Sequence, residues 1–314
     1  MSSTARKILL NTLSQVAGKL VIGVFGIITV KILTTYLGKS GYGFYKSIFE
    51  FMAFFAIVAD LGLYTIGVRE MSKDKEKEEM VLGNILTIRT LLIIVISIIA
   101  IVSSFFVSEF QNTIAPFAVT IAGLATIFAI LTGTISSVLQ VHLKMEYNSL
   151  GSVVGKLISL AVMIGTIFVI YPGGCTVKDV VLENCKVQDG ALYSMFFAGV
   201  IGNIAMFLVT YYYTRKLVKV KYRFDLPFWK EVLWKALPYG IALVLNTVYF
   251  RIGSILLLLL KGKEFVGIYG VPLTMLEAAG IIPLYFMNSI LPVLTRSLND
   301  ARSVGEGSRK SRSS

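Results

Sequence analysis

Residues 91–107 read LLIIVISIIAIVSSFFV, a stretch of 17 positions without a charged side chain. A helix needs roughly 20 mostly apolar residues to cross the hydrocarbon core of a bilayer, which is about 30 Å thick. This stretch is the centre of a predicted span over residues 82–107. Seven further runs have the same character, at 8–36, 42–68, 112–142, 150–171, 191–214, 235–260 and 264–294. The sequence therefore predicts an all-α, polytopic integral membrane protein with about eight transmembrane helices.

The composition agrees with this class. Of 314 residues, 55% are hydrophobic and 15% are charged, and the mean hydropathy is +0.77. A soluble domain this apolar would lack the polar surface that keeps it dispersed. The net charge of +12 does not indicate nucleic-acid binding, because the basic residues lie mostly between apolar runs and accompany no recognisable motif. The first apolar run is too long for a signal peptide, so we expect it to remain as a span.

The connections between the runs alternate between basic and weakly charged. Cytoplasmic loops carry the excess of lysine and arginine in membrane proteins. With eight spans, the alternation predicts a multi-pass protein of the cell (cytoplasmic) membrane with both termini in the cytoplasm. Anionic substrate handling is a smaller possible source of the positive charge.

The segment 222–235, YRFDLPFWKEVLWK, mixes aromatic and charged residues. We interpret it as a short amphipathic helix at the membrane interface. It separates six spans from two, which predicts a six-helix lobe over 1–221 and a linker with the first two helices of a second lobe over 222–300. The serine-, glycine- and arginine-rich tail, 301–314, is expected to be disordered.

Polar residues inside the spans are the candidates for a site, because ionisable groups at bilayer depth usually face a wet cavity or a partner. Asn11, Gln15 and Lys19 are spaced i, i+4, i+8 and so share one helix face. Lys19 could line a cavity that attracts an anion, or it could reach the headgroups. The same alternatives apply to three further basic residues: Arg89, Lys156 and Arg251.

Two acidic residues complete this set. Glu277 lies within the last span and needs a partner or a proton, and Arg251 in the adjacent span is its expected partner. Asp60 is expected to cap a helix end or to pair with Arg69 or Arg89.

Cys175 and Cys185 lie in one loop that the topology places outside the cytoplasm, so they could form a disulfide or remain two thiols. No histidine accompanies them, and we expect no metal site and no cofactor. The sequence holds no hydrolase, phosphate-loop or metalloprotease motif. We therefore expect a protein that is not an enzyme.

Several segments resemble one family of membrane proteins. The spacing of Asn11, Gln15 and Lys19 and the segments named below look like successive parts of polysaccharide and O-antigen flippases, the lipid-linked oligosaccharide flippases of the multidrug/oligosaccharidyl-lipid/polysaccharide exporter superfamily. The segments are TTYLGKSGYGFYKSIFEF (34–51), ADLGLYTIGVREMSK (59–73), LQVHLKMEYNSLGSVVGK (139–156) and ALPYGIALVLNTVYFRIGSILLLLLKGKEFVGIYGVPLTMLE (236–277).

The resemblance implies two six-helix lobes around a central cationic cavity that opens to each side in turn. It implies transport of a polyprenyl-pyrophosphate-linked oligosaccharide for cell-surface polysaccharide biosynthesis, with the lipid bilayer and this anionic lipid as partners and a coupling cation as a further candidate. Lys19 and Arg251 would then meet the pyrophosphate. The family's aspartate two residues after the arginine of the seventh span is Gly253 here.

The family has twelve or more spans, so we expect this chain to be C-terminally truncated relative to it. Two alternatives stay open: a cation-coupled drug antiporter of the same superfamily, and a truncated membrane protein that does not transport.

Overall fold

The computed structural model describes residues 3–111, 113–172 and 189–279, with only the backbone for 3–14 and 277–279. The chain divides into two compact units, Met1–Val271 and Pro272–Ser314. The described elements are α1 (Ser3–Asp60), α2 (Leu63–Lys73), α3 (Glu78–Ser104), α4 (Ala115–Val141), α5 (Met145–Gly165), α7 (Asp189–Thr214), α8 (Leu226–Lys261), α9 (Lys263–Ala279) and the short helices η1 (Lys75–Lys77), η2 (Ser108–Phe110) and η3 (Thr166–Ile170).

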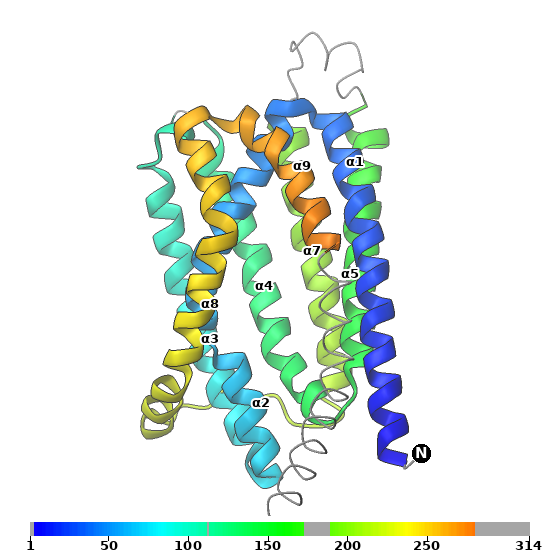
Figure 1. The fold of residues 1–314 in the computed structure, drawn as a ribbon, viewed down its shortest axis with the longest axis vertical. Coiled ribbons are helices and arrows are strands. Elements are labelled where there is room, and N and C mark those ends of the chain that lie inside the picture. The colour runs from blue at the N-terminus through cyan, green and yellow to red at the C-terminus, as the bar shows by residue number, and fades with distance from the viewer. Residues whose placement is uncertain (1–2, 112, 173–188, 280–314) are drawn as a thin grey trace, which may run out of the picture. The chain divides into compact units, whose positions relative to one another are not determined.

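Helix α1 contains two crossings rather than one. Gly38 has the left-handed φ of 67° inside it, which breaks the helix into two halves. Figure 1 shows the first half running from the N-terminus along the bundle and the second half returning toward α2. These halves match the predicted spans 8–36 and 42–68 in number and direction.

The apolar runs form helices as predicted. Six described helical segments are long and apolar enough to cross a membrane. Because the first of them holds both halves of α1, and α9 begins the predicted eighth run, the fold confirms an all-α membrane protein with about eight spans. Large apolar side chains face outward, as along α3, where Ile94, Val95, Ile98 and Val102 are 44–56% exposed. A contiguous face of this kind is unusual in a soluble protein and fits contact with lipid tails.

The second predicted span ends earlier in the structure than in the sequence interpretation. The helix stops at Asp60, and Leu61 and Gly62 both have positive φ, so α2 starts as a separate helix at Leu63. The prediction of a continuous span to residue 68 is wrong here. Asp60 comes directly before this pair, and the left-handed conformation of Leu61 and Gly62 interrupts the helix.

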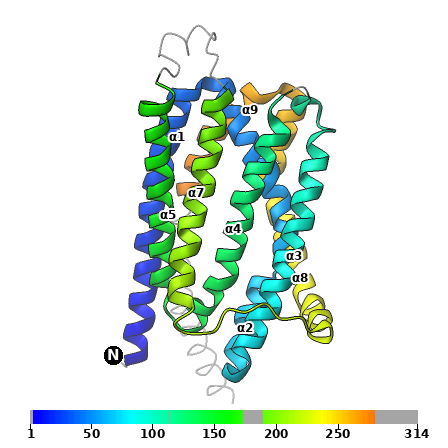
Figure 2. The same ribbon diagram turned by 180° about the vertical axis from the view of Figure 1, so that it is seen from behind.

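Basic connections gather at one end of the first unit. Figure 2 shows the N-terminus, α2, the turn between α4 and α5 and the linker after α7 at the same end. The sequence pattern that alternates basic and weakly charged connections therefore corresponds to two ends of a bundle. Which end faces the cytoplasm stays a prediction.

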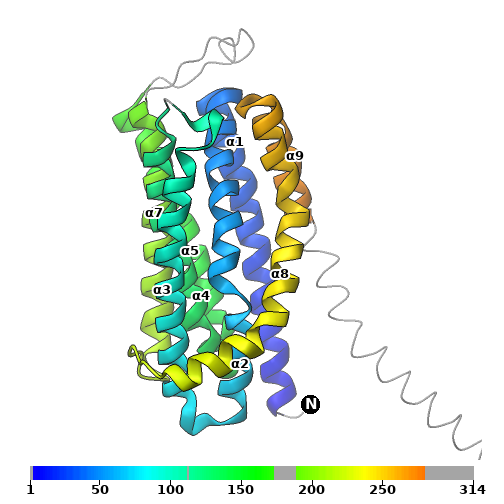
Figure 3. The same cartoon turned by 90° about the vertical axis from the view of Figure 1, so that its left-hand side faces the viewer.

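The predicted amphipathic segment is the start of α8. Asp225 caps this helix through its side chain, which accepts a hydrogen bond from the Phe228 backbone nitrogen at 3.2 Å. Figure 3 shows the first turns of α8 running across the end of the bundle before the helix bends upward. Pro238 lies inside the helix, and a proline removes a backbone hydrogen bond and kinks a helix.

Asn84 of α3 fastens the linker to this end of the bundle. Its side-chain oxygen accepts hydrogen bonds from the Asp225 backbone nitrogen and the Trp229 ring nitrogen, both at 2.9 Å. Its amide nitrogen donates to the Met80 carbonyl at 2.9 Å, and the side chain is fully buried. The side-chain oxygen of Asn84 therefore holds the end of the linker and the start of α8 in place.

Helices α5 and α7 approach each other through glycine. A Cβ at Gly155 would lie 2.6 Å from the Gly202 carbonyl oxygen, and a Cβ at Gly202 would lie 2.7 Å from that of Gly155. Such contacts leave no room for a side chain, as at small-residue crossings of other membrane helices. This close approach sets the distance between the two helices that carry most of the candidate site.

Replacing Gly155 by valine should therefore lower stability. We expect a loss of about 1–3 kcal/mol from overpacking, seen as a lower thermal midpoint of the purified protein in detergent. Gly165→Val is the matched control on the same helix, because a Cβ there meets nothing within 4 Å. An equal loss in both variants would attribute the effect to helix propensity and not to the crossing.

Candidate functional site

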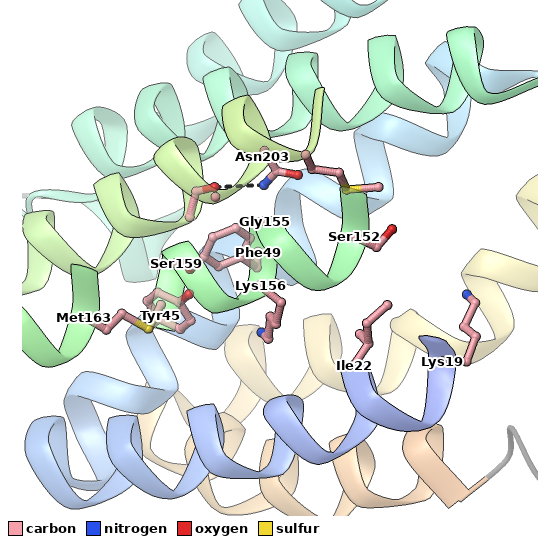
Figure 4. Close-up of a pocket in the computed structure, with 13 residues that line it drawn as sticks. Lys19, Ile22, Tyr45, Phe49, Ser152, Gly155, Lys156, Ser159, Met163 and Asn203 are labelled. Carbon is pink, nitrogen blue, oxygen red and sulfur yellow. Dashed lines mark hydrogen bonds between the residues drawn. The ribbon is translucent and has the colours of Figure 1, made fainter. Parts of the chain in front are cut away.

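A pocket of about 400 Å³ lies inside the first unit, among both halves of α1, α5 and α7 (Figure 4). Its walls carry charged, hydroxyl, amide, aromatic and glycine positions. They are Lys19, Ile22, Tyr45, Phe49, Ser152, Gly155, Lys156, Ser159, Met163, Gly199, Gly202, Asn203 and Met206. Two of the lining residues are lysines and none is a carboxylate, so the pocket is cationic and suited to an anion.

Lys156 lies near the middle of α5, 11 positions after Met145, the first residue of the helix. At 1.5 Å per residue this is about 16 Å, which compares with half the thickness of a hydrocarbon core. Figure 4 shows its side chain pointing from α5 into the pocket toward the first half of α1. Among the described residues it has no hydrogen-bond or ion-pair partner. Burying an unpaired ammonium inside a membrane protein costs free energy. Its presence here indicates a site that binds an anion.

Lys19 lies at the other end of the pocket. Figure 4 shows it on the first half of α1, beyond Ile22 and away from Lys156. Its side chain is exposed, so it can also reach solvent or headgroups. The structure thus brings together two of the predicted cavity residues from helices that lie far apart in sequence.

The wall opposite Lys19 is aromatic. Tyr45 and Phe49 line the pocket, and the centroids of their rings lie 4.8 Å apart. Behind them Phe196 packs 5.0 Å from Tyr45 and 5.6 Å from Phe49. On α7, Asn203 donates its amide to the Gly199 carbonyl at 2.9 Å. This wall combines flat apolar faces with a phenol and an amide, groups that can contact a sugar or a polyprenyl chain.

Arg251 does not line this pocket. Its guanidinium lies 2.5 Å from one carboxylate oxygen of Glu50, and the Lys46 ammonium lies 2.9 Å from the other. Glu50 is 2% exposed. Sequence reasoning missed Glu50 and Lys46. The signal was present, because a carboxylate inside the apolar run IFEFMAFF needs a cation, and Lys46 stands four residues before it.

Glu277, the expected partner of Arg251, lies in the part of α9 for which only the backbone is described. The pairing of Glu277 with Arg251 therefore stays a prediction, in addition to the observed contact between Arg251 and Glu50. Asn11 likewise falls where only the backbone is described, and Gln15 is half-buried on α1 outside the pocket lining. Cys175 and Cys185 lie outside the described residues.

Arg89 belongs to a separate ion pair. Its guanidinium lies 2.5 Å from Asp60, at the end of α1, and the arginine is 3% exposed. Of the two partners offered for Asp60, the structure therefore selects Arg89. Its remaining nitrogens Nε and Nη1 are buried with no hydrogen-bond partner in the described part of the chain. The pair joins α1 to α3 away from the pocket lining.

No group of three or more histidine, cysteine, aspartate or glutamate side chains that could hold a metal ion occurs within residues 3–111, 113–172 and 189–279. The pocket lining itself offers ammonium, hydroxyl and amide groups, which can attract an anion and form hydrogen bonds.

Comparisons with known proteins agree with the fold. The model of a family described as polysaccharide biosynthesis protein matches residues 5–298. No curated protein matches. The fold is similar to that of a solved structure named protein A, with a TM-score of 0.63 and 16% identity over 94% of this chain. The chain spans 66% of the length of that protein.

Proposed function

Because the chain belongs to the polysaccharide biosynthesis protein family, we propose that it moves a polyprenyl-pyrophosphate-linked oligosaccharide across the cytoplasmic membrane by alternating access. The family is one of polysaccharide biosynthesis and transport, which agrees with the lack of a catalytic motif in the sequence. The single observation that carries the finer proposal is the pocket with two lysines and no carboxylate among its lining residues.

The positive charge of the pocket indicates which class of substrate it binds. A pyrophosphate carries several negative charges, and its attraction to an ammonium is far stronger in a low-dielectric site than in water. A cation-coupled drug antiporter needs acidic cavity groups instead. The two carboxylates of the second half of α1, Glu50 and Asp60, are both held by basic side chains. We therefore favour an anionic lipid as the substrate.

The arrangement proposed from the sequence fits this activity. On this proposal, residues 1–221 belong to one lobe, and the linker that starts at residue 222 leads into the first helices of a second. Both termini lie in the cytoplasm. The anionic headgroup enters the cationic pocket, and the polyprenyl chain stays in lipid.

A reconstitution assay tests the function. Proteoliposomes carry radiolabelled polyprenyl-pyrophosphoryl-N-acetylglucosamine in both leaflets, and galactosyltransferase with its donor is added outside. The enzyme should convert only the outer-leaflet half in empty liposomes and nearly all of the lipid in liposomes that contain the protein. The matched control lipid is a polyprenyl glycoside without the pyrophosphate, which should stay at half.

Each other outcome counts against the proposal in its own way. Conversion that never exceeds half would mean that the chain does not transport. Equal movement of both lipids would mean scrambling without recognition of the pyrophosphate. Accumulation of a cationic dye in place of lipid movement would indicate the antiporter.

A further inference from the structure

The linker between α7 and α8 carries a run of positive charge. Residues 215–223 read RKLVKVKYR and hold five basic residues and no acidic one. Among them Lys221 and Arg223 are exposed, and so is Lys230 in the second turn of α8. The side chains of these three residues form no hydrogen bond or ion pair within the described part of the chain. Unpaired cations at one end of a membrane protein attract a negatively charged partner.

Burial along the linker alternates between successive residues. Val218 is buried and Val220 is half-buried, and both belong to the apolar cluster that joins α2, α3 and α8. Lys219 and Lys221, which alternate with them, are exposed. Side chains of an extended chain point to opposite sides in turn. The valines therefore hold the linker on the bundle, and Lys221 and Arg223 share its outer side.

Helix α3 fixes the backbone of the linker. The Arg223 backbone nitrogen donates hydrogen bonds to the Gly83 carbonyl at 3.3 Å and to the Thr87 hydroxyl at 3.2 Å. A Cβ at Gly83 would lie 2.4 Å from the Lys221 carbonyl oxygen, so the linker runs directly over α3. A backbone that is already held in place loses little conformational entropy when its side chains bind a ligand.

A groove of about 610 Å³ opens beside Arg223. Its lining consists of Met80, Asn84 and residues 223–227. Asp225 is the carboxylate in this lining, and it is engaged as the cap of α8, where it accepts a hydrogen bond from the Phe228 backbone nitrogen. The guanidinium of Arg223 is therefore the charged group that the groove offers to a ligand, and arginine binds phosphate through two parallel hydrogen bonds.

The first turns of α8 present an apolar stripe beside these cations. Leu226, Leu233, Trp234 and Leu237 are 72%, 37%, 67% and 43% exposed. Their spacing of i, i+7, i+8 and i+11 places them on one side of the helix, and Lys230 lies on the same side. Figure 3 shows this part of α8 running across the end of the bundle. Leucine and tryptophan next to basic residues are typical of helices that lie in the headgroup region of a bilayer.

We propose that the linker and the first turns of α8 form a docking surface for anionic phospholipids of the surrounding bilayer. The lipid phosphates lie at Lys221, Arg223 and Lys230, and the apolar stripe lies among the upper parts of the acyl chains. An interfacial position alone would suit any phospholipid. The run of five basic residues without an acidic one favours a negatively charged headgroup over a zwitterionic one. This surface is separate from the pocket that contains Lys156.

The two tryptophans of the chain report on this surface without a label. Both lie in the first turns of α8, where Trp234 is exposed and Trp229 is half-buried and donates to Asn84. Brominated acyl chains quench the fluorescence of a tryptophan that they contact. The full chain is reconstituted in liposomes that contain either brominated phosphatidylglycerol or brominated phosphatidylcholine at the same mole fraction. The quenching gives the relative affinity of the surface for the two lipids.

Phosphatidylglycerol should bind about fivefold more tightly than phosphatidylcholine, because a basic residue near an anionic lipid stabilises binding by about that factor. Trp234→Phe should remove most of the quenching. The combined variant Lys221→Gln/Arg223→Gln/Lys230→Gln should lose the preference, and high salt should weaken it in the original chain. Arg223→Gln alone should lower the preference less, so the result does not depend on how well the combined variant folds.

Lys75→Gln is the matched control. Lys75 is exposed at the same end of the bundle, but Asp74 and Glu76 flank it. Its loss removes the same charge, and the preference for phosphatidylglycerol should stay. The thermal midpoint of each variant should also stay, since the substituted side chains are exposed and unpaired.

Four results would overturn the proposal. Equal quenching by both lipids would mean that the surface does not select charge. A preference that survives the combined variant would place the selection elsewhere on the chain. Absence of quenching by either lipid would mean that protein and not lipid covers the stripe. Relief of the quenching by farnesyl pyrophosphate, a short analogue of the proposed transport substrate, would make the groove part of the substrate path.

Discussion

Arg89→Met is expected to lower the free energy of unfolding by about 3 kcal/mol, because it strands the Asp60 carboxylate without its cation. Arg89 is 3% exposed, and its guanidinium lies 2.5 Å from Asp60. Methionine fills much of the volume of the arginine stem, so the loss reports the charge and not a cavity. Reversible unfolding of the detergent-solubilised protein in urea measures it.

A second variant isolates the ion pair. Adding Asp60→Asn to Arg89→Met removes the stranded charge and should recover part of the loss, which gives a coupling energy for the pair. Arg69→Met is the matched control, since Arg69 is exposed on α2, and it should change stability by less than about 0.5 kcal/mol. If Arg89→Met and Arg69→Met lowered the free energy of unfolding equally, the buried Arg89–Asp60 pair would not be stabilising the junction of α1 and α3.

The number and order of the spans could be predicted from the sequence because lipid imposes a length on every crossing. The run around Ile94 is too apolar for a helix of a soluble protein, and it forms α3 in the structure. The left-handed break at Leu61 and Gly62 could not be placed by hydropathy, although Asp60 directly before it was expected to cap a helix end. A break of that kind is determined by backbone conformation at two residues and not by the composition of the run.

The sequence indicated which charged residues are important, but it did not indicate which residues they pair with. Helical periodicity assigns Lys19 to a face of α1, but it does not say that Lys156, 137 residues later, faces the same pocket. Arg251 was assigned to Glu277 because the two lie in adjacent spans, and Glu50 was overlooked. Neighbours in a bundle depend on how all the helices pack, which no single span encodes.

Substitution of Lys156 should weaken ligand binding without lowering stability. Lys156→Met is expected to weaken binding of farnesyl pyrophosphate by about 10- to 100-fold, because a charge-assisted hydrogen bond contributes about 1.5–3 kcal/mol. Since Lys156 has no partner among the described residues, the same change should leave the thermal midpoint unchanged or raise it. Equilibrium binding and thermal unfolding on one preparation measure both effects.

The controls for Lys156 follow from its geometry. Lys156→Arg keeps the positive charge and should retain most of the affinity, while Lys219→Met, at an exposed lysine of the linker, should change neither quantity. Lys19→Met should cost less affinity than Lys156→Met, because Lys19 is exposed and water screens its charge. A fall in stability with unchanged affinity in Lys156→Met would make Lys156 a structural residue and leave the pocket without its anion anchor.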